Sequence, residues 1–230
     1  MRAILLAAGF GTRLRPLTNT IPKCLVPIKG KPLLQIWIER LKIAGITRCV
    51  VNTHYLSEKV ETFIDESEFG KDVTVIHEEI LRGTAGTLMH NIDFFENKDG
   101  LLIHADNYCL ANFNEFLEAH NDRPRGCLMT VMAFRAKEPT KCGVFELNDS
   151  NVVVGFHEKV DSPPSDLANG AIYLLSDELQ QLLKADFADA TDFSTEVMPN
   201  LMGKIYCYET KETFIDIGSP ETYEEANKLA

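Results

Sequence analysis

The chain begins with a run of apolar residues that stops at a glycine. Ala3–Ala8 contains no charged or polar side chain, and Gly9 and Gly11 follow it directly. A continuous apolar run that ends at glycine is typical of a strand that is buried on both faces and opens into a loop. Strands of this kind lie inside parallel sheets, because helices cover both faces of such sheets. The sequence therefore predicts an α/β fold with this strand near the centre of its sheet.

Strands and helices alternate over about the first 120 residues. Leu34, Trp37, Ile38 and Leu41 have helical spacing, and Gly45 is placed to end that helix. Ser57 and Asn112 are the expected N-caps of two later helices. Further strands are expected at 49–53, 72–77 and 101–105, and a helix at 85–95. This order predicts a doubly wound, mostly parallel sheet with right-handed crossovers.

The pattern changes after residue 126. Strand-like segments, two of them joined by a polar turn at 148–151, now follow one another at 127–134, 143–147, 152–157 and 171–175. Helices return at 177–183, near 194–202 and from 220 to the end. We expect one domain, 1–230, in which residues 126–230 add antiparallel strands and a small lid to the half formed by residues 1–125.

Charge and cysteine content exclude several classes of protein. Lys and Arg number 23 against 34 Asp and Glu, a net charge of −11, which disfavours general binding to nucleic acid or to an anionic membrane. The apolar start is shorter than the roughly 20 residues of a spanning helix and lacks the pattern of a signal peptide. The six cysteines form no C-x-x-C pair. We expect a cytoplasmic protein.

The glycine loop after the first strand is followed by cations. Arg13, Arg15 and Lys23 lie within eleven positions, and the glycines allow backbone N–H groups to approach a phosphate closely. The dinucleotide fingerprint is excluded because Leu14 stands in place of its third glycine, and the Gly-Lys-Ser/Thr of a P-loop is absent. The loop therefore predicts a different kind of site, for a triphosphate or a pyrophosphate leaving group.

The segment Gly9-x-Gly11-Thr12-Arg13-Leu14-x-Pro16-Leu17-Thr18, with Pro22-Lys23, resembles the opening motif of the sugar-1-phosphate nucleotidylyltransferases. The resemblance covers nearly the whole chain and is closest in type to mannose-1-phosphate and heptose-1-phosphate guanylyltransferases. It implies a Rossmann-like nucleotidyltransferase fold with a mixed, mostly parallel sheet flanked by helices. It also implies that the 230 residues form one such domain, without an appended acyltransferase or β-helix.

The resemblance assigns two sets of binding residues. The nucleotide would contact the glycine loop and a second glycine-rich segment that opens a helix, where N–H groups face a ligand. This nucleotide set is Ala8, Gly9, Gly11, Thr12, Arg13, Lys23, Gly83, Thr84, Ala85 and Gly86. The sugar-phosphate set is Gly143, Glu158, Lys159 and Asn169. Lysine would neutralise the phosphate, while Glu and Asn would bind ring hydroxyls.

Asp106 and Asp216 are the expected metal ligands. Each follows an apolar strand-like segment, and Asp106 comes at the edge of the sheet where ligands of open α/β folds bind. Two carboxylates that converge repel one another unless a cation lies between them. The resemblance assigns Mg²⁺ to this pair, together with triphosphate oxygens.

The resemblance implies that a sugar 1-phosphate oxygen attacks the α-phosphorus of a nucleoside triphosphate in line and releases pyrophosphate, with Arg13, Lys23 and Asp106 as catalytic residues. GTP with a mannose- or heptose-type sugar, for surface polysaccharide precursors, is favoured. The alternatives are uridylyl, thymidylyl or cytidylyl transfer to another phosphate acceptor, and a non-catalytic nucleotide-sensing subunit.

Three features of the sequence depart from the family pattern: Ala105, Arg82 and the order Asn169-Gly170-Ala171. The sequence leaves the oligomeric state open, a homo-oligomer included.

Overall fold

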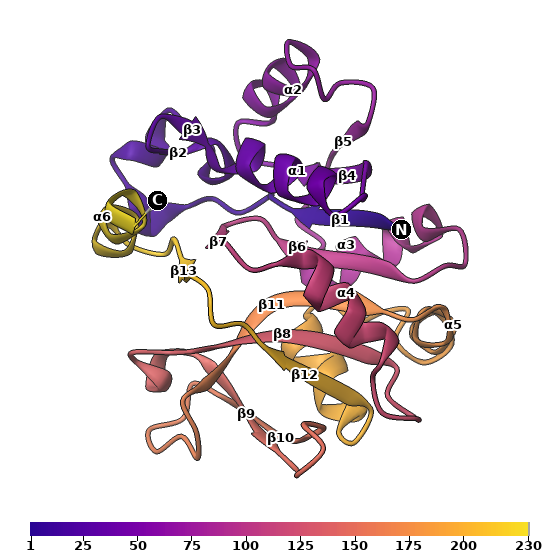
Figure 1. The fold of residues 1–230 in the computed structure, drawn as a ribbon. Coiled ribbons are helices and arrows are strands. Elements are labelled where there is room, and N and C mark those ends of the chain that lie inside the picture. The colour runs from indigo at the N-terminus through magenta and orange to yellow at the C-terminus, as the bar shows by residue number, and fades with distance from the viewer. Residues whose placement is uncertain (230) are drawn as a thin grey trace.

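A nine-stranded mixed sheet runs through the whole molecule (Figure 1). The computed structural model describes residues 1–229. Seven strands follow one another in the order β10-β9-β11-β6-β1-β4-β5, and β8 lies between β11 and β12. The strands of this sheet are β1 (Arg2–Leu6), β4 (Arg48–Thr53), β5 (Val73–His77), β6 (Gly100–His104), β8 (Met129–Arg135), β9 (Gly143–Leu147), β10 (Val153–Glu158), β11 (Leu167–Leu175) and β12 (Ile205–Glu209).

The first strand has the central place that its apolar sequence predicts. β1 pairs in parallel with β4 on one side and with β6 on the other, and β5 continues the parallel arrangement beyond β4. Its residues alternate between two hydrophobic cores, as side chains of a strand must. Ala3 and Leu5 pack in the core that holds Trp37, whereas Ile4 packs in the core that holds Leu88. The sheet therefore separates two cores, each covered by helices.

Six α-helices cover the sheet and its edges in the described part of the chain. They are α1 (Leu33–Ile43), α2 (Ser57–Asp65), α3 (Gly83–Asn91), α4 (Phe113–Asn121), α5 (Asp177–Asp186) and α6 (Pro220–Leu229). The expected stop at Gly45 is confirmed by its φ of +75°, and the Asn112 side chain caps α4 by accepting from Asn114 N at 3.1 Å. The prediction that Ser57 is an N-cap is wrong: Leu56 holds that position and Ser57 is the first helical residue. None of the described helices is long and apolar enough to span a bilayer.

Short helices and two small sheets complete the architecture. The short helices are η1 (Thr12–Leu14), η2 (Leu17–Asn19), η3 (Lys23–Leu25), η4 (Ile92–Phe95), η5 (Pro139–Lys141), the π-helix η6 (Phe193–Val197) and η7 (Met198–Leu201). The small antiparallel sheets pair β2 (Pro27–Ile28) with β3 (Lys31–Pro32), and β7 (Asn107–Cys109) with β13 (Phe214–Asp216). The second of these holds the C-terminal part of the chain against the end of β6.

The second half of the chain is antiparallel where it joins the first. β11 pairs antiparallel with β6 on one side and with β8 on the other, and the β9–β10 hairpin attaches to it through Ala168 and Val144. β11 begins at Leu167, four residues before the expected start, because the strand continues through an irregularity between Asn169 and Tyr173. Ala171 lies in that irregularity with φ +52°. The predicted α/β class and mixed sheet are confirmed.

Candidate active site

The glycine loop after β1 is held by a close backbone approach at Gly11. This residue has φ +62°, and a Cβ added to it would lie 3.0 Å from Thr18 Cγ2 and 3.2 Å from Lys23 Cβ. Its carbonyl oxygen accepts hydrogen bonds from the Thr18 hydroxyl at 2.7 Å and from the Leu14 N–H at 3.0 Å. Glycine is therefore needed at this position to bring the loop against the segment that carries Lys23.

Lys23 lies between the two predicted metal ligands. Its ammonium nitrogen is 2.6 Å from Asp106 Oδ2 and 3.8 Å from Asp216 Oδ1. Asp106 follows the end of β6, and Asp216 is the last residue of β13, which pairs with β7 just after Asp106. The Lys23 side chain is only 8 % exposed, whereas the two carboxylates are partly open to solvent. The structure thus brings together three charged groups that are far apart in the sequence.

The pKa values of the two carboxylates are shifted in opposite directions. Burial opposes ionisation of Asp106, but the charge and the hydrogen bond of Lys23 outweigh it and lower the pKa of this carboxyl. Burial raises the pKa of Asp216, and the negative charge of Asp106 adds to that effect, against the charges of Lys23 and Arg13. Asp106 is therefore the more strongly held anion of the pair.

The donor set of this cluster fits a small divalent cation. Both carboxylates approach one cationic group, the Lys23 ammonium, and carboxylate oxygen is a preferred ligand of Mg²⁺. Residues 1–229 contain no group of three or more His, Cys, Asp or Glu side chains arranged to hold a metal ion. Magnesium commonly keeps water and substrate phosphate oxygens in its coordination sphere, so two protein carboxylates suffice.

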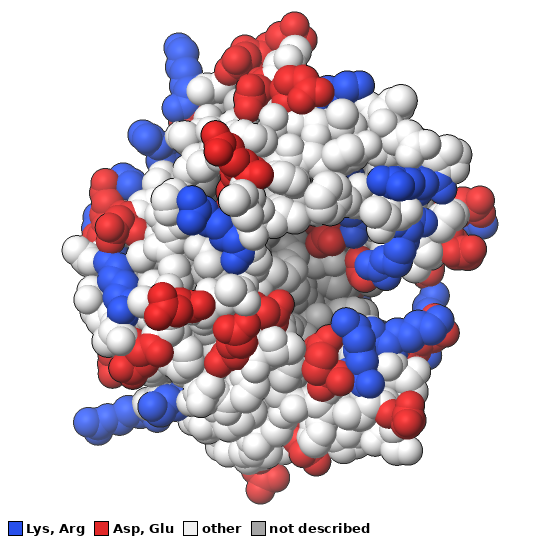
Figure 2. Space-filling model, turned by 180° about the vertical axis from the view of Figure 1, so that it is seen from behind, with Lys and Arg blue, Asp and Glu red and all other residues white. Residues whose placement is uncertain are grey.

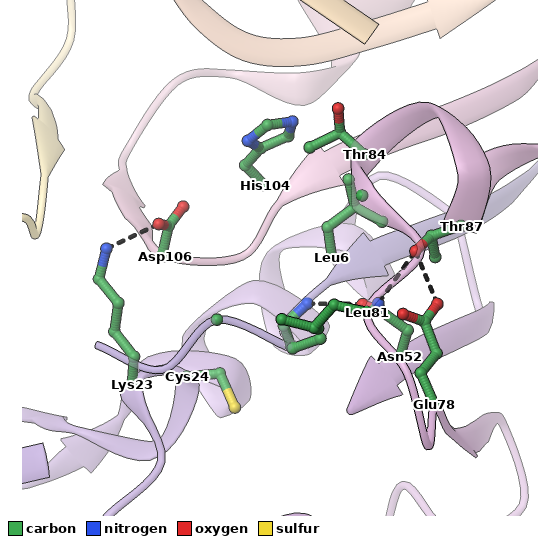
Figure 3. A pocket seen from close by; sticks show the side chains of 14 residues that line it. Leu6, Lys23, Cys24, Asn52, Glu78, Leu81, Thr84, Thr87, His104 and Asp106 are labelled. Carbon is green, nitrogen blue, oxygen red and sulfur yellow. Dashed lines mark hydrogen bonds and ion pairs between the residues drawn. The ribbon is translucent and has the colours of Figure 1, made fainter. Parts of the chain in front are cut away.

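A pocket of about 250 Å³ opens beside this cluster (Figure 3). It lies between the loop after β1, the end of β6 and the first turn of α3, and Asp106 and Lys23 stand at one side of it. Its lining is Leu6, Ala7, Ala8, Gly9, Lys23, Cys24, Asn52, Glu78, Leu81, Gly83, Thr84, Thr87, His104 and Asp106. Five of these belong to the predicted nucleotide set: Ala8, Gly9, Lys23, Gly83 and Thr84.

The other members of the nucleotide set lie outside this lining. Ala85 is buried in a hydrophobic core, and Gly86 packs against Arg82 and the backbone of Ala190. Arg13 is exposed and lies on the Asp216 side, where a Cβ added to Gly218 would lie 3.0 Å from its guanidinium. It lines a second hollow of about 350 Å³ with Asp216. Gly11 and Thr12 belong to the loop itself.

The glycine-rich start of α3 has a packing role. Gly83 has φ +77°, and a Cβ there would lie less than 3.0 Å from the carbonyl oxygen of Thr191. The same oxygen accepts from the Ala85 N–H at 3.0 Å, and the Thr84 hydroxyl accepts from the Phe193 N–H at 2.8 Å. The first turn of α3 is therefore fixed to the segment 191–193, and this fixes the wall of the pocket.

The sequence reasoning missed a buried polar network in the same pocket. Asn52, at the end of β4, accepts from the Ala7 N–H at 2.8 Å, and its amide donates to the Thr87 hydroxyl at 3.3 Å. That hydroxyl donates to Glu78 Oε1 at 2.6 Å, and Glu78 is 3 % exposed. Two features of the sequence could have indicated this network. Asn52 is a polar residue within an apolar strand, and Glu78 directly follows β5.

Three residues of the predicted sugar-phosphate set meet at one end of the β9–β10 hairpin. Gly143 pairs with Glu158 across the two strands, and a Cβ on Gly143 would overlap the Glu158 carboxylate. Glu158 forms an ion pair with Lys159 at 2.9 Å. Cys142, next to Gly143, lines the hollow that holds Asp216. Burial raises the pKa of the Cys142 thiol, and the charges of Asp216 and Glu158 act in the same direction. This end of the hairpin therefore lies near Asp216, one of the two predicted metal ligands.

Asn169 stands at the irregularity of β11. Its amide nitrogen donates to the Tyr173 hydroxyl at 2.8 Å, and its carbonyl oxygen accepts from the Ala171 N–H at 2.9 Å. Asn107, just after Asp106, donates to the carbonyl oxygen of Gly170 at 3.1 Å. The Asn169-Gly170-Ala171 segment is thus a strand irregularity that holds Asn169 near the end of β6.

The site as a whole lies in a recess of mixed charge. Figure 2, viewed from behind, shows a hollow with both basic and acidic side chains around its opening. Lys23, Asp106 and a buried carboxylate lie within one pocket. A cluster with cations and carboxylates can bind phosphate groups and a metal ion together.

The sequence of residues 2–230 matches the family described as nucleotidyl transferase. The chain belongs to the nucleotidyl transferase family. The resemblance to sugar-1-phosphate nucleotidylyltransferases is confirmed at the level of the family. Mannose-1-phosphate guanyltransferase from Saccharomyces cerevisiae is 31 % identical over 97 % of this chain and 63 % of its own length. Glucose-1-phosphate thymidylyltransferase from Streptomyces griseus is 33 % identical over 95 % of this chain and 58 % of its own length.

A solved structure shares the nucleotidyl transferase architecture over the whole chain. HddC from Yersinia pseudotuberculosis, in complex with GMP-PN, superposes with a TM-score of 0.82 at 25 % identity and covers 99 % of this chain and 98 % of that one. This chain spans about three fifths of the length of the curated relatives that it matches.

Proposed function

We propose that this nucleotidyl transferase family member transfers a nucleoside monophosphate from a nucleoside triphosphate to a sugar 1-phosphate, releasing pyrophosphate. The observation that carries the proposal is the convergence of Lys23, Asp106 and Asp216 beside a pocket whose wall is the glycine loop. Phosphate transfer needs charge neutralisation and alignment more than covalent catalysis, and this cluster offers both signs of charge.

In this reaction an oxygen of the sugar 1-phosphate attacks the α-phosphorus, and the bond to the β-phosphate breaks as pyrophosphate leaves. The attacking oxygen is already ionised, so no general base is required. Lys23, at the edge of the pocket, would neutralise charge on the α-phosphate, and Arg13 would act on the Asp216 side. Backbone N–H groups of the loop after β1 would hold the phosphates. Lys159 would neutralise the sugar phosphate.

Asp106 and Asp216 would hold Mg²⁺ in the working enzyme. Bound there, the metal would neutralise charge on the triphosphate oxygens that it contacts. The Lys23 ammonium now lies between the same carboxylates, so it would be released toward the substrate phosphates when a second cation enters. Removal of Mg²⁺ with a chelator should abolish pyrophosphate release without unfolding the protein.

Glu78 favours guanine as the base. Guanine presents two neighbouring donors, N1–H and the 2-amino group, and a carboxylate can accept both, whereas uracil and thymine present one N–H between two carbonyls. The Glu78 carboxylate is buried in the pocket with only neutral donors, the Thr87 hydroxyl and the Arg82 N–H, as its described hydrogen-bond partners. The S. cerevisiae relative is named a guanyltransferase, which supports the same base.

Glu78→Gln should lower kcat/KM for GTP by about tenfold or more, because the amide presents a donor where guanine also donates. Its oxygen can still accept from Thr87, but the Arg82 N–H loses its acceptor, so thermal melting must establish that the variant is folded. The measurement is pyrophosphate release with GTP and UTP at fixed sugar 1-phosphate. The exposed neighbour Glu79 gives the matched control Glu79→Gln. An unchanged ratio of GTP to UTP activity in Glu78→Gln would exclude Glu78 from base selection.

The whole proposal is tested by a substrate panel. Purified protein is incubated with Mg²⁺, each common nucleoside triphosphate, and mannose, heptose and glucose 1-phosphates, and pyrophosphate is measured. We expect the highest rate with GTP and a mannose- or heptose-type sugar. Thymidylyl or uridylyl transfer is the second candidate, supported by the S. griseus relative. Nucleotide binding without pyrophosphate release in any combination would favour a nucleotide-sensing subunit instead. We further propose a cytoplasmic role in supplying surface polysaccharide precursors; the free cysteines support the cytoplasmic location.

A further inference from the structure

His104 is a pocket residue to which the proposed mechanism gives no task. It ends β6, two residues before Asp106, and it lines the pocket. In Figure 3 its ring stands on the side of Asp106 and Thr84, away from Asn52 and Glu78. Its Nε2 atom is buried and has no hydrogen-bond partner among residues 1–229. A buried polar nitrogen without a partner is rare, because leaving it unpaired costs free energy.

The surroundings of His104 connect the nucleotide pocket with the sugar-phosphate set. The ring packs edge-on against Tyr173, with centroids 6.3 Å apart. Tyr173 is fully buried, and its hydroxyl accepts the hydrogen bond from the Asn169 amide. On the other side, His104 lies beside Leu6 in the register of β6 and β1, at the floor of the pocket. Tyr173 therefore contacts both residues: its ring packs against His104, and its hydroxyl binds the Asn169 amide.

The charges near His104 favour a neutral partner over a phosphate. Asp106 lies between His104 and the ammonium of Lys23, so the nearest formal charge on that side is negative. The carboxylate of Asp192 also acts on the ring. Phosphate groups would be held by Lys23 and by the cation bound to Asp106 and Asp216, which leaves an uncharged group as the partner of the ring. A hydroxyl carries no charge and can either donate to or accept from an imidazole nitrogen.

We propose that His104 is a substrate-binding residue that hydrogen-bonds a sugar hydroxyl where the nucleotide and the acceptor sugar meet. The proposal rests on the nucleotidyl transfer proposed above, since that reaction places a ribose and a second sugar in the site together. The hydroxyl belongs either to the ribose or to the sugar 1-phosphate. The chemistry is the same in both cases, and the experiment separates them.

In the test, each variant of His104 is assayed with a set of substrate analogues, each of which lacks one hydroxyl. One series uses 2′-deoxy- and 3′-deoxy-GTP, and the other uses sugar 1-phosphates deoxygenated at one ring position at a time. For the wild type, the analogue that lacks the bonded hydroxyl should have a kcat/KM about tenfold below that of the full substrate. In His104→Leu this penalty should disappear for that analogue alone, and His104→Asn should retain part of it.

The control variant is His90→Leu, because His90 is an exposed histidine of α3 and lies outside the pocket lining. Loss of the penalty in the nucleotide series identifies the ribose, and loss in the acceptor series identifies the other sugar. If His104→Leu lowers the activity of every substrate by one common factor, His104 has only a structural role and the proposal is wrong. A wild type that releases no pyrophosphate would instead refute the proposed function. Thermal melting establishes that each variant is folded.

Discussion

Asp106→Asn should reduce pyrophosphate release by roughly a hundredfold to a thousandfold at saturating substrate, the usual effect of losing one preorganised electrostatic contact. Asp106 is the carboxylate that Lys23 keeps ionised, so its loss removes the stronger anion of the pair. Asp216→Asn should act in the same direction and raise the Mg²⁺ concentration needed for half-maximal rate. The rate is measured by coupled pyrophosphate detection over a Mg²⁺ titration.

The exposed Asp161 supplies the matched control, since Asp161→Asn makes the same chemical change at a residue that lines neither hollow of the site. Lys23 is nearly buried, so Asp106→Asn also leaves an ammonium with a single, more distant carboxylate. Some loss of thermal stability is therefore expected, and circular dichroism must establish that the variants are folded. Near-normal activity of folded Asp106→Asn and Asp216→Asn proteins would show that these residues do not hold the metal.

Gly83→Ala should destabilise the protein by about 3 kcal/mol, which lowers Tm by about 10 °C in a chain of this size. Two effects add: the left-handed backbone at φ +77° disfavours a side chain, and the new methyl group would overlap the carbonyl oxygen of Thr191. Nucleotide affinity should fall as well, because Gly83 and Thr84 form a wall of the pocket. Thermal melting and titration with GTP measure the two losses.

Gly30→Ala separates the two effects. Gly30 has nearly the same backbone, φ +82°, but nothing lies within 4 Å of the position of its Cβ. Its substitution should cost only the conformational strain, about 1 kcal/mol. Equal destabilisation of the two variants would mean that the segment 191–193 moves away without cost and does not fix the start of α3.

The parallel half of the fold is predictable because its signals are local. Consecutive apolar residues predict that β1 is a buried strand. Asn112 caps α4 by accepting a hydrogen bond from Asn114, two positions away. Two strands depart from the prediction for non-local reasons. The strand expected from residue 171 begins at Leu167, because pairing with β8 extends it back through Asn169. β12 owes its place to parallel pairing with β8, which lies far away in the sequence.

The residues of the candidate site likewise divide into those that the sequence predicts and those that it does not. Asp106 and Asp216 are predicted as metal ligands because each follows an apolar strand-like segment and the resemblance assigns Mg²⁺ to the pair. Glu78 and Asn52 are not predicted, because what distinguishes them is burial inside a network whose hydrogen bonds join residues up to 45 positions apart. Whether Arg13 faces the nucleotide pocket or Asp216 also depends on the path of the loop, which its composition does not determine.

β11 joins the two halves of the chain in one sheet. Tyr173 pairs with Leu102 of β6 on one side and with Val131 of β8 on the other, so a single stretch of backbone belongs to both halves. Neither half can lose its sheet without breaking hydrogen bonds of the other. We therefore expect one cooperative unfolding transition, with fluorescence and circular dichroism curves that coincide. Fragments 1–125 and 126–230, expressed separately, should each remain unfolded and regain structure only when mixed.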